Sequence, residues 1–192
     1  MSALESANKI KAKFGDIVSA PVEFRGEISL GISDAEKIFD VCLFAKKQLG
    51  FDYLVDISSV DNYGTDPRWT VVYHLRGMAS GEELRLKTDV SEEKSGLPSV
   101  LPVWRTANWH EREIYDMMGI RFAGHPDLRR ILMWEGYPYH PLRKDFPLAG
   151  KPSDVPGVAF TNPAPLEGGP FVTVAGGGDA ILREPRVRTP EK

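Results

Sequence analysis

The chain has 192 residues, 42% apolar and 27% charged, which is typical of one soluble globular domain, and two full domains would be cramped. Its 24 basic and 27 acidic residues give a net charge of −3, which excludes a general attraction to nucleic acid or anionic lipid, although a local basic patch lies near residues 129–144. The single cysteine excludes an internal disulfide or an iron–sulfur cluster held by this chain alone, and no apolar run approaches the roughly 18–20 residues of a membrane span.

The first 32 residues predict a helix followed by two short strands. Apolar residues recur at helical spacing from Leu4 to Phe14, with Leu4 on the inner face, and Gly15 is expected to end the helix. Residues 17–32 follow as two strands around Gly26, and a proline marks the first of them as an edge strand.

A second helix is predicted between Ser33 and Gly50. Ser33 is expected to cap its start, and Glu36, three residues later, completes a capping box. The apolar inner face consists of Ile38, Val41, Cys42 and Ala45. Cys42 is therefore interpreted as a buried structural residue.

Three strands follow, at residues 51–64, 68–77 and 82–90, because these segments are rich in β-branched and aromatic residues and are separated by turn residues. Such a meander predicts an antiparallel or mixed sheet, with the hairpin at 66–90 as its firmest pairing. A third, short helix is expected to begin at Asn108, with Glu111 reaching back to its start, and to end before Gly119.

The predicted fold class is α+β, with a mixed or antiparallel sheet of four to five strands and two to three packed helices. We expect an α+β domain at residues 1–120, followed by a turn segment at 121–148. Residues 149–192 form a tail rich in proline and glycine, which cannot bury enough apolar surface to fold alone. Such a tail is either disordered or laid across a partner, and we expect an extended arm that docks on partner subunits.

The third helix and the turns after it carry an unusual density of charge. Arg112 and Asp116 are spaced for an ion pair on one helical face. Asp116 also lies in the last turn, where the helix dipole disfavours an anion, so a cation from Arg129 or Arg130 is expected to compensate it. The alternative interpretation is a solvated charged face with an internal ion pair.

Two His-Pro turns, at His125 and His140, are each followed by a pair of basic residues. They suit binding of an acidic surface or a phosphate. The alternative is ordinary turn chemistry, with Asp127 capping a short helical turn over Leu128, Ile131 and Leu132.

No sequence signature of an active site is present. The histidines and the cysteine lack zinc spacing, and the chain has no phosphate-binding glycine loop or serine nucleophile elbow. We therefore expect no catalytic, cofactor-binding or metal-binding residues in this chain.

The gapless stretch at 111–133, EREIYDMMGIRFAGHPDLRRILM, resembles the signature of the 30 kDa subunit family, the C subunit of the respiratory NADH–quinone oxidoreductase (Complex I, NDH-1). The matched positions are Glu111, Arg112, Glu113, Asp116, Met117, Met118, Gly119, Ile120, His125, Arg129, Ile131 and Leu132. A second similar block runs from Gly136 to Leu148, and the resemblance covers roughly residues 30–150.

The resemblance implies a subunit of the peripheral arm that binds no cofactor of its own. The complex passes electrons from a donor through flavin (FMN) and iron–sulfur clusters on other subunits to quinone and translocates protons, so the chain would be an enzyme subunit without catalytic residues. Its implied partners are the large quinone-pocket (D) subunit and neighbouring iron–sulfur subunits, on the cytoplasmic face of the cell inner membrane. The implied interface residues are Glu111, Arg112, Glu113, Asp116, His125, Arg129, Arg130, His140, Arg143, Lys144 and Asp145.

The same family also occurs in membrane-bound hydrogenases and in quinone reductases that use a donor other than NADH. The motif does not separate these complexes, so the electron donor stays open at this point.

Overall fold

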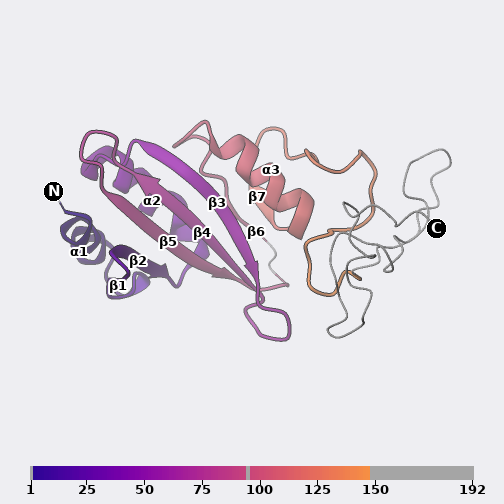
Figure 1. The fold of residues 1–192 in the computed structure, drawn as a ribbon, viewed down its shortest axis with the longest axis horizontal. Helices are drawn as coiled ribbons and strands as arrows, with labels where there is room; N and C mark the ends of the chain where they lie inside the picture. Colours follow the sequence, from indigo (N-terminus) through magenta and orange to yellow (C-terminus); the bar gives the residue numbers. More distant parts are fainter. Residues whose placement is uncertain (1, 94–95, 148–192) are drawn as a thin grey trace, which may run out of the picture. The chain divides into compact units, whose positions relative to one another are not determined.

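The computed structural model describes residues 2–93 and 96–147, so the predicted tail at 149–192 lies outside the described residues (Figure 1). The helices are α1 (Ala3–Phe14), η1 (Gly15–Ile17), η2 (Ala35–Lys37), α2 (Ile38–Leu49) and α3 (Ala107–Met118). The strands are β1 (Val22–Phe24), β2 (Glu27–Ile32), β3 (Tyr53–Asp61), β4 (Trp69–Arg76), β5 (Glu83–Val90), β6 (Gly96–Pro98) and β7 (Arg121–Ala123). No helix in this part of the chain is long and apolar enough to cross a bilayer.

The main sheet has five strands in the order β1-β2-β5-β4-β3. The meander of β3, β4 and β5 is antiparallel, whereas β2 pairs with β5 in parallel, so the sheet is mixed. β1 pairs only with β2 and forms an edge, as predicted. A separate two-stranded parallel sheet joins β6 and β7, and the sequence pattern did not predict it.

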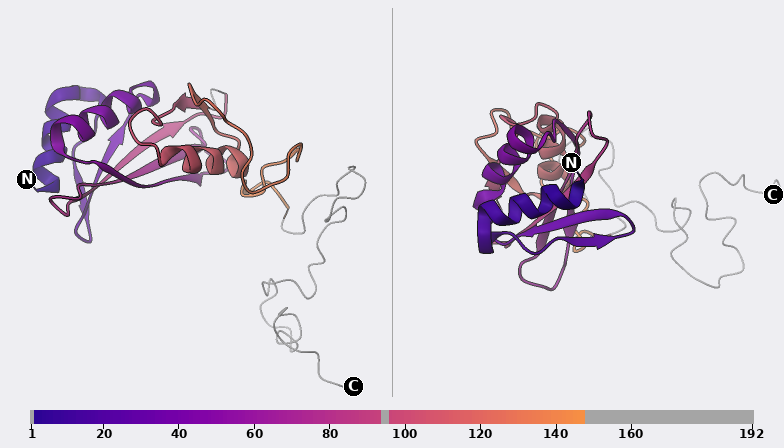
Figure 2. Two further views of the ribbon diagram at one scale, coloured as in Figure 1. Left: turned by 90° about the horizontal axis from the view of Figure 1, so that it is seen from above. Right: turned by 90° about the vertical axis from the view of Figure 1, so that its left-hand side faces the viewer.

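One face of the five-stranded sheet is buried under the helices. Alternate residues of β4 and β5, among them Trp69, Tyr73 and Leu86, belong to one core cluster with the inner faces of α1 and α2. The inner face predicted for α2 is confirmed, since all four of its apolar residues are buried. α1 and α2 lie together near the N-terminus, and α3 lies along β3 (Figures 1 and 2).

Two local predictions at the helix starts were wrong. Leu4 is exposed, because the buried face of α1 is formed by Ala3, Ser6, Ala7 and Ile10. Ser33 does not cap the second helical segment; its hydroxyl donates to the carbonyl of Ile17. The carboxylate of Asp34 accepts from the Glu36 amide instead, because a turn of 3₁₀ helix precedes α2.

α3 begins at Ala107, one residue before the predicted cap at Asn108, and Thr106 precedes it without a side-chain cap. Its predicted end at Gly119 is confirmed, since this residue has a φ of 82°, a conformation that glycine adopts without strain. The first compact unit of the chain comprises Met1–Arg143.

Candidate functional site

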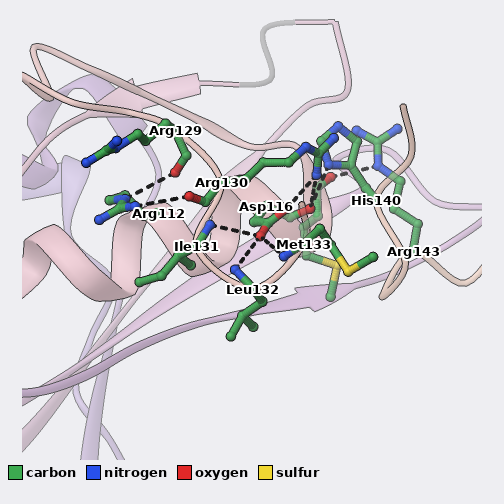
Figure 3. Close-up of polar contacts among 10 residues, drawn as sticks. Arg112, Asp116, Arg129, Arg130, Ile131, Leu132, Met133, His140 and Arg143 are labelled. Atoms are coloured by element: carbon green, nitrogen blue, oxygen red, sulfur yellow. Dashed lines mark hydrogen bonds and ion pairs between the residues drawn. The ribbon is translucent and has the colours of Figure 1, made fainter. Parts of the chain in front are cut away.

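Asp116 lies fully buried at the C-terminal end of α3, where its carboxylate anchors the segment that follows β7 (Figure 3). One carboxylate oxygen, Oδ2, accepts hydrogen bonds from the amides of Ile131, Leu132 and Met133, at 3.0, 2.7 and 2.8 Å. The other oxygen, Oδ1, pairs with the guanidinium of Arg130. We call these four donors and their acceptor the Asp116 anchor.

The Asp116 anchor shifts the acidity of its carboxyl group. Burial alone would raise the pKa of Asp116, but the hydrogen bonds from the three amides and Arg130 together hold it below its ordinary value. Asp116 is therefore an anion at neutral pH. The prediction that a cation from outside the helix compensates Asp116 is confirmed for Arg130, whereas Arg129 pairs with Asp127 on the surface.

A turn at residues 140–143 satisfies the last carbonyls of α3, which have no partner within the helix. The His140 ring nitrogen Nδ1 lies 2.9 Å from the Asp116 carbonyl, and it carries the proton because a carbonyl only accepts. The Leu142 amide donates to the Met117 carbonyl, and Arg143 donates through Nε to the Met118 carbonyl at 2.7 Å. The second His-Pro turn therefore caps α3.

Gly119 fits between α3 and this turn because it has no side chain. A Cβ atom at this position would lie 2.7 Å from Nε2 of His140 and would also meet Arg143. Its positive φ adds a second requirement for glycine. The close approach of the turn at 140–143 and the positive φ together explain why position 119 is a glycine.

Arg112 does not form the predicted ion pair with Asp116. It is only 9% exposed, and its guanidinium donates through Nε to the Arg129 carbonyl and through Nη2 to the Arg130 carbonyl, at 3.1 and 3.0 Å. It also lies over the ring of Trp109. Within the described part of the chain, Arg112 holds the backbone of the following segment and neutralises no carboxylate.

Glu111 points into the core from the other half of α3, so its predicted role in a capping box was wrong. It is fully buried, and its carboxylate accepts from the Ser99 hydroxyl at 2.6 Å and the Val100 amide at 2.7 Å. Burial raises the pKa of Glu111 to about 7, and these two hydrogen bonds offset only part of the shift. It fixes the loop after β6 against α3.

The ring of His125 faces Glu111, with Nε2 4.0 Å from the nearer carboxylate oxygen, which is too long for a hydrogen bond. Its other nitrogen, Nδ1, accepts from the Asp127 amide. Burial is the main cause that lowers the pKa of His125 below its ordinary value. The first His-Pro turn is thus ordinary turn structure, but no helix forms over Leu128, Ile131 and Leu132, because the amides of 131–133 bond to Asp116.

The interpretation of the 111–133 stretch as a solvated charged face was wrong, since Glu111, Arg112 and Asp116 are all buried. Glu113 is exposed on α3, and Lys144 and Asp145 lie beyond the first compact unit. No pattern in the sequence marks the donors at Ser99, Val100 and 131–133, most of which are backbone amides that every residue except proline possesses.

We call residues 129–133, whose backbone bonds to Arg112 and Asp116, the anchored segment. Exposed apolar side chains lie on this segment, on the turn at 140–143 and on α3. Leu132 and Leu142 are 61% and 58% exposed, and Trp109 on α3 is also exposed. Sequence reasoning missed all three as candidate contact residues. The described residues contain no group of three or more His, Cys, Asp or Glu side chains that could hold a metal ion.

The sequence is similar to those of several known proteins. The family profile described as "Respiratory-chain NADH dehydrogenase, 30 Kd subunit" matches residues 32–152. The chain is 45% identical over 142 residues to the C subunit of the NADH-quinone oxidoreductase of Geotalea uraniireducens, covering 74% of this chain and 86% of that one. It is 46% identical over 154 residues to a C subunit, numbered 2, of the Rhizobium etli oxidoreductase, covering 78% and 81%.

Two solved structures share the fold. A trypsin-resistant fragment (1-134) of Nqo5 is 32% identical, with a TM-score of 0.55, over 65% of this chain and 97% of the fragment. A chain of an archaeal membrane-bound sulfane sulfur reductase is 24% identical, with a TM-score of 0.63, over 75% of this chain and 85% of that one. The second likeness concerns the fold alone.

Proposed function

Because the chain belongs to the 30 kDa subunit family of the respiratory-chain NADH dehydrogenase, we propose that it is a structural and assembly subunit in the peripheral arm of a proton-translocating NADH–quinone oxidoreductase. In this proposal the chain carries no catalytic residue. Electrons pass from NADH through FMN and iron–sulfur clusters on other subunits to quinone, and the assembly couples this transfer to proton translocation.

The observation that carries the proposal is that two buried charged side chains of α3 bind backbone groups of a surface segment. Asp116 and Arg112 bond mostly to backbone groups of residues 129–133, so they fix the shape of a surface segment. That segment exposes Leu132, and the α3-capping turn exposes Leu142. In the proposed complex these two leucines contact another subunit, since apolar side chains form the core of such interfaces.

This arrangement divides the proposed interface residues into two groups. Glu111, Arg112 and Asp116 lie behind the surface, where they hold it in shape. Glu113 and Arg129 are exposed and can contact a partner directly. The proposed partners are the large quinone-pocket (D) subunit and neighbouring iron–sulfur subunits, at the cytoplasmic face of the cell inner membrane.

The test is purification of the affinity-tagged chain from membranes of its source cells in a mild detergent. We expect a multisubunit complex that oxidises NADH with quinone as acceptor. Recovery of the tagged chain as a lone monomer would contradict the proposal.

A pair of variants sharpens the test. Leu132→Asp is expected to reduce co-purification of the other subunits at least about tenfold, because it places a carboxylate in an apolar contact. Met78→Asp is the matched control, since Met78 is 63% exposed in the turn between β4 and β5 and takes no part in the anchored segment. Both variants should have the circular dichroism spectrum of the wild type.

The same purification separates the alternative complexes. The fold also occurs in a chain of a membrane-bound sulfane sulfur reductase, so the fold does not specify the electron donor. A recovered complex that contains flavin- and NADH-binding subunits identifies NADH as the donor. A complex that lacks them and reduces another acceptor, or evolves hydrogen, points to the hydrogenase-type or alternative-donor assembly.

A further inference from the structure

A surface hollow of about 450 Å³ lies between α3 and the anchored segment. Three arginines line it, Arg112, Arg129 and Arg130, together with Tyr115 of α3 and Tyr137. Of the buried charged residues of α3, Arg112 alone lines this hollow.

The three arginines differ in how far their charge is compensated. Arg130 pairs with the buried Asp116. Arg129 pairs with Asp127, but both side chains are more than half exposed, so water screens that pair. Arg112 pairs with no carboxylate among the described residues and donates only to two carbonyls. Asp116, Asp127 and Glu135 together balance the three arginines, so the hollow has no excess charge overall, and Arg112 is distinguished by having no paired carboxylate among the described residues.

The donors that remain suit a small anion. Arg112 uses Nε and Nη2 for the carbonyls, which leaves Nη1 without a hydrogen bond among the described residues. Arg129 uses Nε for Asp127 and has terminal nitrogens on the surface. One donor from each arginine matches the two oxygens of a carboxylate, whereas a phosphate would have further oxygens to satisfy.

We propose that this hollow binds a carboxylate side chain of another subunit, held between Arg112 and Arg129 with its aliphatic stem against the tyrosines. The proposal rests on the assembly function proposed above, which supplies the polypeptide partner. The guanidinium of Arg112, held rigid by two carbonyls, would lose little conformational entropy on binding.

The test uses the intact complex and a zero-length carbodiimide cross-linker. In the Arg129→Lys variant, the cross-linker forms an amide between the new amine and a carboxylate in contact with it, with loss of water. We expect mass spectrometry to find the amine at position 129 joined to an Asp or Glu of a different subunit. The control is Arg121→Lys, an exposed position on β7 outside the hollow, which should give at least about fivefold less of such a product.

A charge reversal gives an independent readout. Arg129→Glu should lower the recovery of partner subunits about tenfold, because it places two carboxylates in contact, and Arg121→Glu should leave recovery unchanged. Arg129 is chosen because its side chain is exposed, whereas Arg112 holds the backbone and its loss would disturb folding.

Three outcomes overturn the proposal. The first is that the cross-links in an intact complex are confined to Asp127 or Glu135 of the same chain. The second is that the cross-linked product contains a lipid phosphate in place of a carboxylate. The third is that Arg129→Glu and Arg121→Glu give equal recovery of the partner subunits. Failure of the proposed function is distinguishable, because in that case the wild-type chain itself would not purify with other subunits.

Discussion

The two halves of α3 place a carboxylate in the protein interior in opposite ways. Glu111 and Asp116 are five residues apart, and neither is exposed to solvent. Glu111 accepts two hydrogen bonds from uncharged donors, and its pKa rises to about 7. Asp116 accepts from three amides and a guanidinium, and its pKa falls. The depth of burial and the number and charge of the donors together decide the charge of a buried acid.

The largest expected effect comes from removing Asp116, which accepts more hydrogen bonds than Glu111. Asp116→Ala should lower the free energy of unfolding by about 3–5 kcal/mol at pH 7, because it leaves three amides and the Arg130 guanidinium without their acceptor. Urea denaturation of the purified chain measures this change. Glu113→Ala, exposed on the same helix, is the control and should change stability by less than about 0.5 kcal/mol. Equal effects of the two variants would mean that the Asp116 anchor contributes little.

The second effect concerns Glu111, whose contribution to the free energy of unfolding depends on pH. The folded-state pKa of Glu111, about 7, lies above its ordinary value of 4.5, so its contribution to stability is present below 4.5 and is lost as the pH rises through 7. The loss amounts to about 3 kcal/mol. Glu111→Gln should abolish this part of the pH dependence.

Urea denaturation of the wild type and Glu111→Gln at pH 5 and pH 8 isolates the contribution of this group, since the other titrating groups cancel in the double difference. We expect the variant to lose less stability than the wild type on going to pH 8. The same pH dependence in both proteins would show that Glu111 titrates as in the unfolded chain.

The smallest effect tests the end of α3 near Asp116. Gly119→Ala should cost about 2 kcal/mol, from its positive φ and from contact of the new Cβ with His140 and Arg143. Gly124→Ala is the matched control, because Gly124 has a φ of 81° with no atom within 4 Å of its Cβ position, and it should cost about 1 kcal/mol. Equal melting temperatures of the two variants would show that the turn at 140–143 moves away from the new Cβ atom without loss of stability.

Sequence reasoning succeeded where the cause was local. The inner face of α2 follows from helical spacing, and the ends at Gly50 and Gly119 follow from the conformation that glycine permits. A cation from Arg129 or Arg130 was predicted from a local conflict, an anion at the wrong end of a helix dipole, and Arg130, 14 residues later, supplies it. In each case the signal lies in the sequence around the residue itself.

It failed where nothing around the residue in the sequence pointed to its partner. Glu111 resembled a capping residue, but its donors lie 11 and 12 residues earlier in the chain, at Val100 and Ser99. Arg112 was expected to pair along the helix, but it donates to carbonyls, which have no signature in a sequence. The parallel pairing of β2 with β5 likewise joins segments that are far apart in the chain.

The Asp116 anchor also affects how the family can vary. Its three donors at 131–133 are backbone amides, so almost any residue except proline could replace Ile131, Leu132 or Met133 without loss of a hydrogen bond. Asp116 itself has no such freedom. A surface built in this way can present other side chains at 131–133, and so fit a changed partner, while Asp116 holds its backbone in the same position.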